Sequence, residues 1–141
     1  MTERGVSLEA DIAETLGVPL LRFLGVRFAE QGPGYARLLL NVRSESLNAN
    51  NSLHAGVLYT LLDVVAYVAL MPLFEPGETA VTHNMNASLM RPVAAGTEVE
   101  LKGHVLRRGR TLVFVQAEAF SEGKQVACAT VCKSIVAAPD A

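Results

Sequence analysis

The sequence has little of several features that define whole classes of protein. Its charge is nearly balanced, with 12 basic against 14 acidic residues and a net charge of -2. A chain without a basic excess has no general field that attracts polyanions, so nucleic acid is not expected as a partner. It contains neither a CxxC nor an HExxH motif, so no metal site is expected either.

Cysteine is also scarce, since the chain contains only Cys128 and Cys132. They are four residues apart in a segment with the pattern of a strand, which would separate them by roughly 13 Å. A disulfide bridges Cα atoms no more than about 7 Å apart. Both are therefore expected to be free thiols that pack as small apolar side chains.

The N-terminal segment MTERGVSLEADIAE is acidic and lacks an apolar signal core, which predicts an intracellular, cytoplasmic protein. The chain has no internal repeat, linker-like segment or low-complexity tract. A length of 141 residues suits one hydrophobic core. We therefore expect a single domain over residues 1–141, with its core over about 20–136.

The longest apolar run covers residues 55–71. Its length suggests a membrane span, but Asp63 at its centre would cost about 2.5–3.5 kcal/mol in a bilayer. Pro72 follows the run directly. A helix that is apolar on almost every side is more simply the buried helix of a globular domain, so no membrane association is expected.

The segments around this helix alternate between apolar and polar residues, as strands do. A short helix over residues 8–16, capped by Ser7, is expected near the N-terminus. The predicted fold is α+β: a curved antiparallel sheet of five to six strands wrapped around one long helix. The strands are expected at about residues 23–30, 35–43, 79–91, 97–107, 111–121 and 124–136.

One polar stripe runs along the apolar helix. Gly56 and Asp63 are seven residues apart, close to two helical turns, and so share a face. Tyr59, Thr60 and Tyr67 complete this stripe. On composition alone, such a stripe can equally face solvent or a neighbouring subunit.

The start of the helix indicates chemistry. His54, Ala55 and Gly56 fall in its first turn, where backbone N–H groups lack a helical partner and the helix dipole is positive. Such a terminus favours an anion, or a carbonyl oxygen that becomes one. Small residues there let a ligand approach the backbone. The default interpretation of His54 is a structural hydrogen-bonding group.

Together these residues resemble the hotdog-fold acyl-CoA thioesterases, in particular the phenylacetyl-CoA thioesterase-like (PaaI-like) branch. That family has an Asn six residues before a His-Gly-Gly turn and an Asp nine residues after the His. The matching residues here are Asn48, His54-Ala55-Gly56 and Asp63. Residues 81–131 are similar to the four-strand half of the same family.

Two positions depart from the family pattern. Ala55 replaces the first Gly of the turn, and Asn51 replaces a Gly usually found three residues before the His. Ala55 keeps its N–H but narrows the approach to it by one methyl group. Asn tolerates the left-handed backbone conformation that such a turn needs.

The resemblance implies hydrolysis of a small aryl- or aliphatic acyl-CoA to the free acid and CoA, without a metal or organic cofactor. In relatives, the N–H at the position of Ala55 binds the thioester carbonyl. The Asp matched by Asp63 comes from the partner subunit and acts as nucleophile or general base. Asn48 and Thr82 are implied to place the reacting groups. A homodimer or homotetramer with active sites at the subunit interface is implied as well.

Further residues are candidates for substrate binding. Guanidinium groups suit the phosphates of CoA, although an ordinary charged hairpin is the simpler alternative. These candidates are Arg91, Arg107, Arg108 and Arg110. Thr60 is a further candidate. Candidates for the acyl pocket are Tyr59, Tyr67, Met85 and Met90, although aromatic and Met residues at such spacings more often belong to a core.

Two other functions compete with hydrolysis on the same fold. One is a non-catalytic protein that binds or senses acyl-CoA, and this alternative stays open. The other, a hotdog hydratase, is disfavoured, because those enzymes pair an Asp with a His five residues later within a segment resembling Asn-Pro-x-His. The segment NNSLHAG contains no such proline.

Overall fold

The computed structural model describes residues 3–139 of the chain and one antiparallel sheet within them. Its helices are α1 (Glu3–Leu16), α2 (Pro19–Leu24) and α3 (Ala55–Leu70), with short 3-10 turns at Ser44–Ser46 and Met71–Leu73. Its strands are β1 (Arg27–Gly32), β2 (Tyr35–Asn41), β3 (Glu78–Leu89), β4 (Glu98–Arg108), β5 (Leu112–Ser121) and β6 (Lys124–Ala137).

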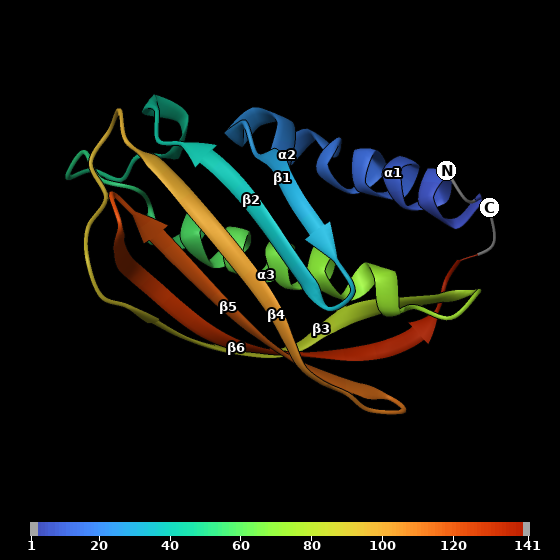
Figure 1. Cartoon of the computed structure of the whole chain (residues 1–141). Helices are drawn as coiled ribbons and strands as arrows, with labels where there is room; N and C mark the ends of the chain where they lie inside the picture. Colours follow the sequence, from blue (N-terminus) through green and yellow to red (C-terminus); the bar gives the residue numbers. More distant parts are fainter. Residues whose placement is uncertain (1–2, 140–141) are drawn as a thin grey trace.

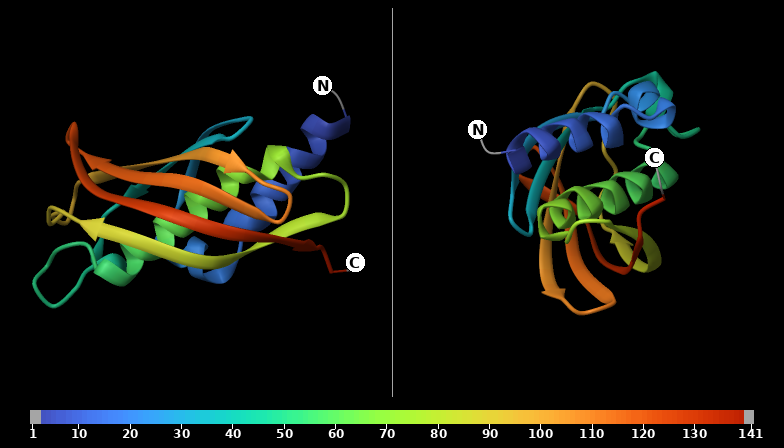
Figure 2. Two further views of the ribbon diagram at one scale, coloured as in Figure 1. Left: turned by 90° about the horizontal axis from the view of Figure 1, so that it is seen from below. Right: turned by 90° about the vertical axis from the view of Figure 1, so that its right-hand side faces the viewer.

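The six strands are ordered β1-β2-β4-β5-β6-β3, and the sheet curves around α3 (Figures 1 and 2). Helices α1 and α2 lie beside the β1 edge of the sheet (Figure 1). The α+β fold predicted from the alternating pattern, with one long central helix in a curved antiparallel sheet, is confirmed. It is the hotdog fold.

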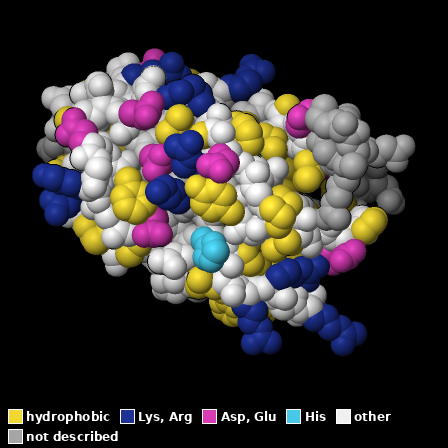
Figure 3. All heavy atoms as spheres, viewed as in Figure 1, with side chains coloured by type: hydrophobic (Ala, Val, Ile, Leu, Met, Phe, Trp, Pro, Cys, Tyr) yellow, Lys and Arg dark blue, Asp and Glu magenta, His cyan; other side chains and the backbone are white. Residues whose placement is uncertain are grey.

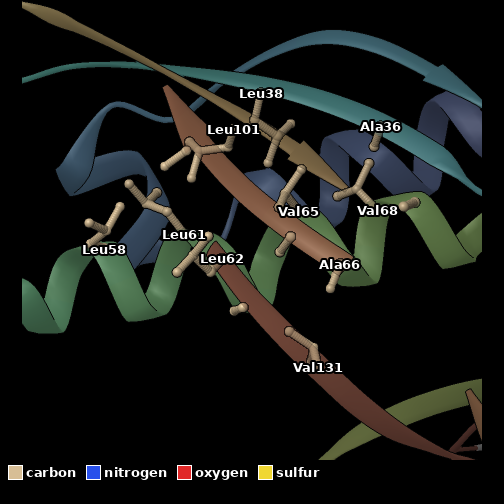
Figure 4. Close-up of a cluster of buried hydrophobic side chains, with 14 of the residues drawn as sticks. Ala36, Leu38, Leu58, Leu61, Leu62, Val65, Ala66, Val68, Leu101 and Val131 are labelled. Carbon is tan, nitrogen blue, oxygen red and sulfur yellow. The ribbon is translucent and has the colours of Figure 1, made fainter. Parts of the chain in front are cut away.

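Helix α3 forms the centre of the hydrophobic core (Figure 4). Leu61, Leu62 and Val65 are fully buried against apolar side chains that alternate along the strands. The closest approach is at Gly103 of β4, where an added Cβ would lie only 2.6 Å from the carbonyl oxygen of Val65. A side chain at this position would therefore push the helix off the sheet.

The apolar segment Ala55–Leu73 is long and hydrophobic enough to cross a membrane by length and composition alone. Half of it is buried inside the molecule, where it packs against the sheet. In this fold the run is therefore a core helix. Cys128 and Cys132 are free, as expected from their spacing along β6.

The N-terminal region differs from the prediction in two respects. Helix α1 begins at Glu3, so Ser7 lies inside it and is not its cap. Pro19 starts an additional helix, α2, that was not expected. A proline is well suited to the first turn of a helix, because its fixed φ fits and its missing N–H would have no helical partner there.

Candidate active site

His54 is the N-cap of α3. Its Nδ1 atom accepts a hydrogen bond from the backbone N–H of Gly56, at 2.9 Å. This contact depends on glycine, since an added Cβ at Gly56 would lie 3.1 Å from His54 Nδ1. The structural role expected for His54 is therefore present in the fold.

The two N–H groups at the start of α3 differ in availability. His54 Nδ1 accepts a hydrogen bond from the N–H of Gly56, whereas no acceptor among the described residues binds the N–H of Ala55. Ala55 is also exposed. The helix thus presents the N–H of Ala55, at its positive end, to any carbonyl oxygen that approaches.

The loop before the helix is held by the side chain of Asn48. Its Oδ1 atom accepts from the backbone N–H groups of Asn50 (2.9 Å) and Ser52 (3.1 Å), and its Nδ2 donates to Ser52 Oγ. Asn51 has a φ of 59°, the left-handed conformation expected of it. Within one protomer Asn48 therefore supports the loop, and its contact with substrate stays a prediction.

Asp63 lies in the middle of α3 and faces strands β3 and β6. Its Oδ1 atom accepts hydrogen bonds from Thr82 Oγ1 at 2.6 Å and from Lys133 Nζ at 3.0 Å. The carboxylate side chain is 36% exposed. Two residues singled out in the sequence, Asp63 and Thr82, are thus brought together.

Lys133 was not identified from the sequence. It is buried, although lysine is rarely buried without a partner. A signal was present, because Ala127, Ala129 and Val131 are the inward-facing residues of β6 and Lys133 continues their period of two. A lysine that continues the spacing of buried residues along a strand is expected to point inward. Such a lysine predicts a partner of opposite charge inside the fold.

The open N–H and the carboxylate do not meet within one protomer. Ala55 and Asp63 are eight residues apart on one helix, which separates them by about 12 Å along its axis. A thioester carbonyl bound at Ala55 is therefore out of reach of Asp63 in the same chain. One chain supplies two halves of a site.

Tyr67 lies one turn beyond Asp63 and lines a cavity of about 1070 Å³. Its hydroxyl group is hydrogen-bonded to Thr79 Oγ1 at 2.9 Å, and its ring packs against Phe74. Thr60 donates its hydroxyl to the carbonyl of Gly56, inside the helix. Tyr59 is exposed on the helix surface.

The candidate arginines lie in two separate places. Arg91 is close in sequence to Val93, whose carbonyl binds the N–H of Leu53 just before α3. The hairpin between β4 and β5 carries the other three and lies at the opposite end of α3 from its first turn (Figure 1). Basic side chains project from that end of the molecule (Figure 3).

Within the hairpin, only Arg108 is engaged by the residues that the structure describes. Its guanidinium pairs with Glu78 at 2.5 Å and also donates to the carbonyl oxygens of Gly109 and Arg110. The backbone N–H of Glu75 and the guanidinium of Arg108 lower the pKa of Glu78. Arg107 and Arg110 are exposed, and no described residue pairs with either side chain. Arg108 thus shapes the hairpin, while its neighbours are open to a ligand.

No group of three or more His, Cys, Asp or Glu residues in the described part of the chain is arranged to hold a metal ion. The chemistry available is therefore that of a carboxylate with a buried lysine behind it, together with a helix N-terminus. These groups lie on one helix and on the curved sheet wrapped around it, the architecture of the hotdog fold.

Comparison with known proteins places the chain in a family. The thioesterase superfamily matches residues 50–128, which include all of α3 and most of the sheet. The chain is 33% identical over 98 residues to human acyl-coenzyme A thioesterase 13, an alignment that covers 69% of each protein. The chain therefore belongs to the thioesterase superfamily and is a thioester hydrolase.

Solved structures agree with this assignment. A variant of the phenylacetic acid degradation protein PaaI from Thermus thermophilus is 28% identical, with a TM-score of 0.76 over 82% of this chain and 97% of that one. A thioesterase from Streptococcus pneumoniae, solved with coenzyme A, shares the fold at 21% identity, with a TM-score of 0.75 over 82% and 91% of the two chains.

Proposed function

We propose that this protein hydrolyses a small aryl- or aliphatic acyl-CoA thioester to the free acid and CoA. The observation that carries the proposal is the pair formed by the open N–H of Ala55 and the partly exposed carboxylate of Asp63. The first stabilises an oxyanion, and the second supplies a nucleophile or a general base.

The two halves join when two copies of the chain associate through β3. This strand is at one edge of the sheet and pairs only with β6 among the described strands. It is twelve residues long and exposes Val81 and Leu89. A long edge strand with exposed apolar residues favours pairing with another strand, and antiparallel pairing with a second copy would continue the sheet.

The direction of α3 relative to β3 determines what such pairing brings together. Asp63 contacts Thr82 and Tyr67 contacts Thr79, so α3 and β3 run in opposite directions. The first turn of α3 therefore lies toward the C-terminal end of β3. A two-fold axis near the middle of β3 then places Ala55 of one subunit opposite Asp63 of the other.

The same symmetry gathers basic groups around the site. The two-fold axis places the β4–β5 hairpin of the partner subunit near the end of this subunit that carries His54 and Arg91. Arg107 and Arg110 have exposed side chains without partners in the described chain. Guanidinium groups bind phosphate oxygens in two-pronged geometry, so these residues fit the phosphates of CoA.

The acyl group fits the cavity beyond Tyr67. Met71, Phe74 and Val18 supply apolar walls, and the carboxylates of Asp11, Glu14, Glu75 and Glu78 also line the space. Negative charge there disfavours an acyl group that ends in a carboxylate. An uncharged aryl or aliphatic group is the acyl class that this cavity accepts.

The chemical step follows from these positions. The N–H of Ala55 binds the thioester oxygen, which gains negative charge as the carbonyl carbon is attacked. Oδ2 of Asp63 either attacks that carbon or removes a proton from the attacking water, since Oδ1 is held by Thr82 and Lys133. The C–S bond then breaks and CoA leaves as the thiol after taking up a proton. On the first route the acyl group remains on Asp63 as a mixed anhydride, which water cleaves to the free acid and the carboxylate of Asp63; on the second route the free acid forms directly.

Release of free thiol from a panel of acyl-CoA thioesters tests this function, with Ala55→Pro as the informative variant. Position 55 is the first of the helix, and His54 has φ -62° and ψ 132°, which a residue before proline readily adopts. The variant should therefore fold normally while it lacks the oxyanion donor. We expect kcat to fall about 10²- to 10³-fold.

Ala55→Gly is the matched control, because it keeps the N–H and removes only the methyl group. It should retain activity. A folded Ala55→Pro variant with the activity of the wild type would contradict the proposed role of the helix terminus. Tight binding of acyl-CoA without thiol release by the wild type would instead establish a non-catalytic binding protein.

A further inference from the structure

Lys133 is the only charged residue that is buried among the side chains described, over residues 8–139. Its side chain is 3% exposed. It lies on β6, directly opposite Thr82 of β3, and both side chains reach Asp63 on α3. An ammonium group buried away from water is stable only when it is paired, so the burial of Lys133 depends on its partners Asp63 and Thr82.

The hydrogen bonds of this cluster have a fixed direction. Lys133 Nζ can only donate, and it lies 3.0 Å from both Asp63 Oδ1 and Thr82 Oγ1. Thr82 must therefore accept from Lys133 and direct its own hydrogen to Asp63 Oδ1. Oδ1 thus receives two hydrogen bonds, while no donor of the described residues reaches Oδ2.

The local backbone supports this arrangement. The register of β3 against β6 shifts between Thr82 and Asn84, which leaves His83 as the extra residue of a β-bulge. Bulges redirect side chains and are common beside active sites. The ammonium of Lys133 also lies 5.5 Å from the ring centroid of Tyr67, a distance at which the aromatic face attracts a cation.

We propose that Lys133 is a positioning residue for Asp63: together with Thr82 it fixes Oδ1, so that Oδ2 is presented to the thioester or to the attacking water. The inference rests on the function proposed above. The groups that face Asp63 are Lys133 from β6, Thr82 from β3, and Tyr59 and Tyr67 one turn away within α3. Lys133 is the cation among them.

Two substitutions separate the charge of Lys133 from its hydrogen bond. Lys133→Met removes both, whereas Lys133→Gln keeps a donor without the charge. We expect kcat of Lys133→Met to fall about 10- to 100-fold through misplacement of Asp63, with KM little changed because Lys133 lies behind the carboxylate. Lys133→Gln should recover part of this loss, because its amide can still donate a hydrogen bond to Oδ1.

The division of the loss between kcat and KM, together with the partial recovery in Lys133→Gln, distinguishes positioning from a purely structural role. A general loss of structure would lower the amount of folded protein in both variants and would not be relieved by the amide donor of Gln. A folded Lys133→Met variant with the kcat of the wild type would overturn the proposal.

A measurement without turnover keeps this test separate from the proposed function. The chain has three aspartates, Asp11, Asp63 and Asp140, so carboxyl-labelled aspartate gives few ¹³C NMR signals, and Asp63→Asn assigns the one of interest. The chemical shift of the Asp63 carboxylate should change in Lys133→Met, where the hydrogen bond from Nζ to Oδ1 is lost, and should change less in Lys133→Gln. An unchanged signal in Lys133→Met would overturn the proposed action of Lys133, whereas absence of thiol release by the wild type would refute only the proposed function.

Discussion

At the scale of single residues, the first turn of α3 shows how one side chain decides which backbone donor is available. His54 accepts the N–H of Gly56 through Nδ1, so the neutral imidazole carries its proton on Nε2. The N–H of Ala55 is left open as a consequence. In the proposed mechanism, His54 therefore acts by leaving the N–H of Ala55 as the oxyanion donor.

Gly56→Ala tests this arrangement. The added Cβ would lie 3.1 Å from His54 Nδ1 and 3.2 Å from Cε1, so the ring must shift and the cap is weakened. We expect the free energy of unfolding to fall by about 0.5–2 kcal/mol, the range for loss of an N-cap, as measured by chemical denaturation. His54→Asn is the control, because Asn caps helices well and should preserve stability. Wild-type stability in Gly56→Ala would contradict the account.

At the scale of elements, the β4–β5 hairpin combines a structural arginine with two that are free to bind. Arg108 joins the hairpin to the start of β3 through Glu78. The exposed side chains of Arg107 and Arg110 have no partner in the described chain. Arg108 therefore holds the hairpin in place, and the side chains of Arg107 and Arg110 are left available to contact a ligand across the proposed interface.

Replacing both Arg107 and Arg110 by Ala tests the phosphate contact. The KM for an acyl-CoA should rise about tenfold or more, since hydrogen bonds to charged groups contribute about 1.5–3 kcal/mol each. The KM for the matching acyl-pantetheine thioester, which lacks the nucleotide phosphates, should not change. Arg37→Ala, elsewhere on the sheet, provides a surface control. An equal rise with both substrates would show that the arginines do not bind phosphate.

The elements themselves were largely predictable, for a physical reason. Strands β2, β4, β5 and β6 and helix α3 each bury one face, so their periodicity shows in the sequence, and short glycine turns separate the later strands. The start of α1 was placed too late, at residue 8, and α2 was missed because Pro19 starts a short helix that the residue pattern does not indicate. Lys133 was missed because a charged residue is not counted among the apolar residues that mark an inward face. Its contact with Asp63 is seen only in the folded sheet.

At the scale of the whole molecule, the proposed site depends on how two copies meet. One chain separates the open N–H of Ala55 from the carboxylate of Asp63 by about 12 Å along a helix, while the edge strand β3 offers a surface for pairing. The two-fold relation proposed for this edge would also join the two groups. We therefore propose that each active site takes its oxyanion donor from one subunit and its carboxylate from the other.

Complementation tests this claim most directly. Ala55→Pro and Asp63→Asn, each inactive alone, are mixed in equal amounts in denaturant, refolded together and assayed for thiol release. If the site spans two subunits, random pairing regenerates intact sites at about a quarter of the wild-type number, because each site needs one intact Ala55 and one intact Asp63. Activity near that level would support the account. A refolded mixture as inactive as its separate components would contradict it.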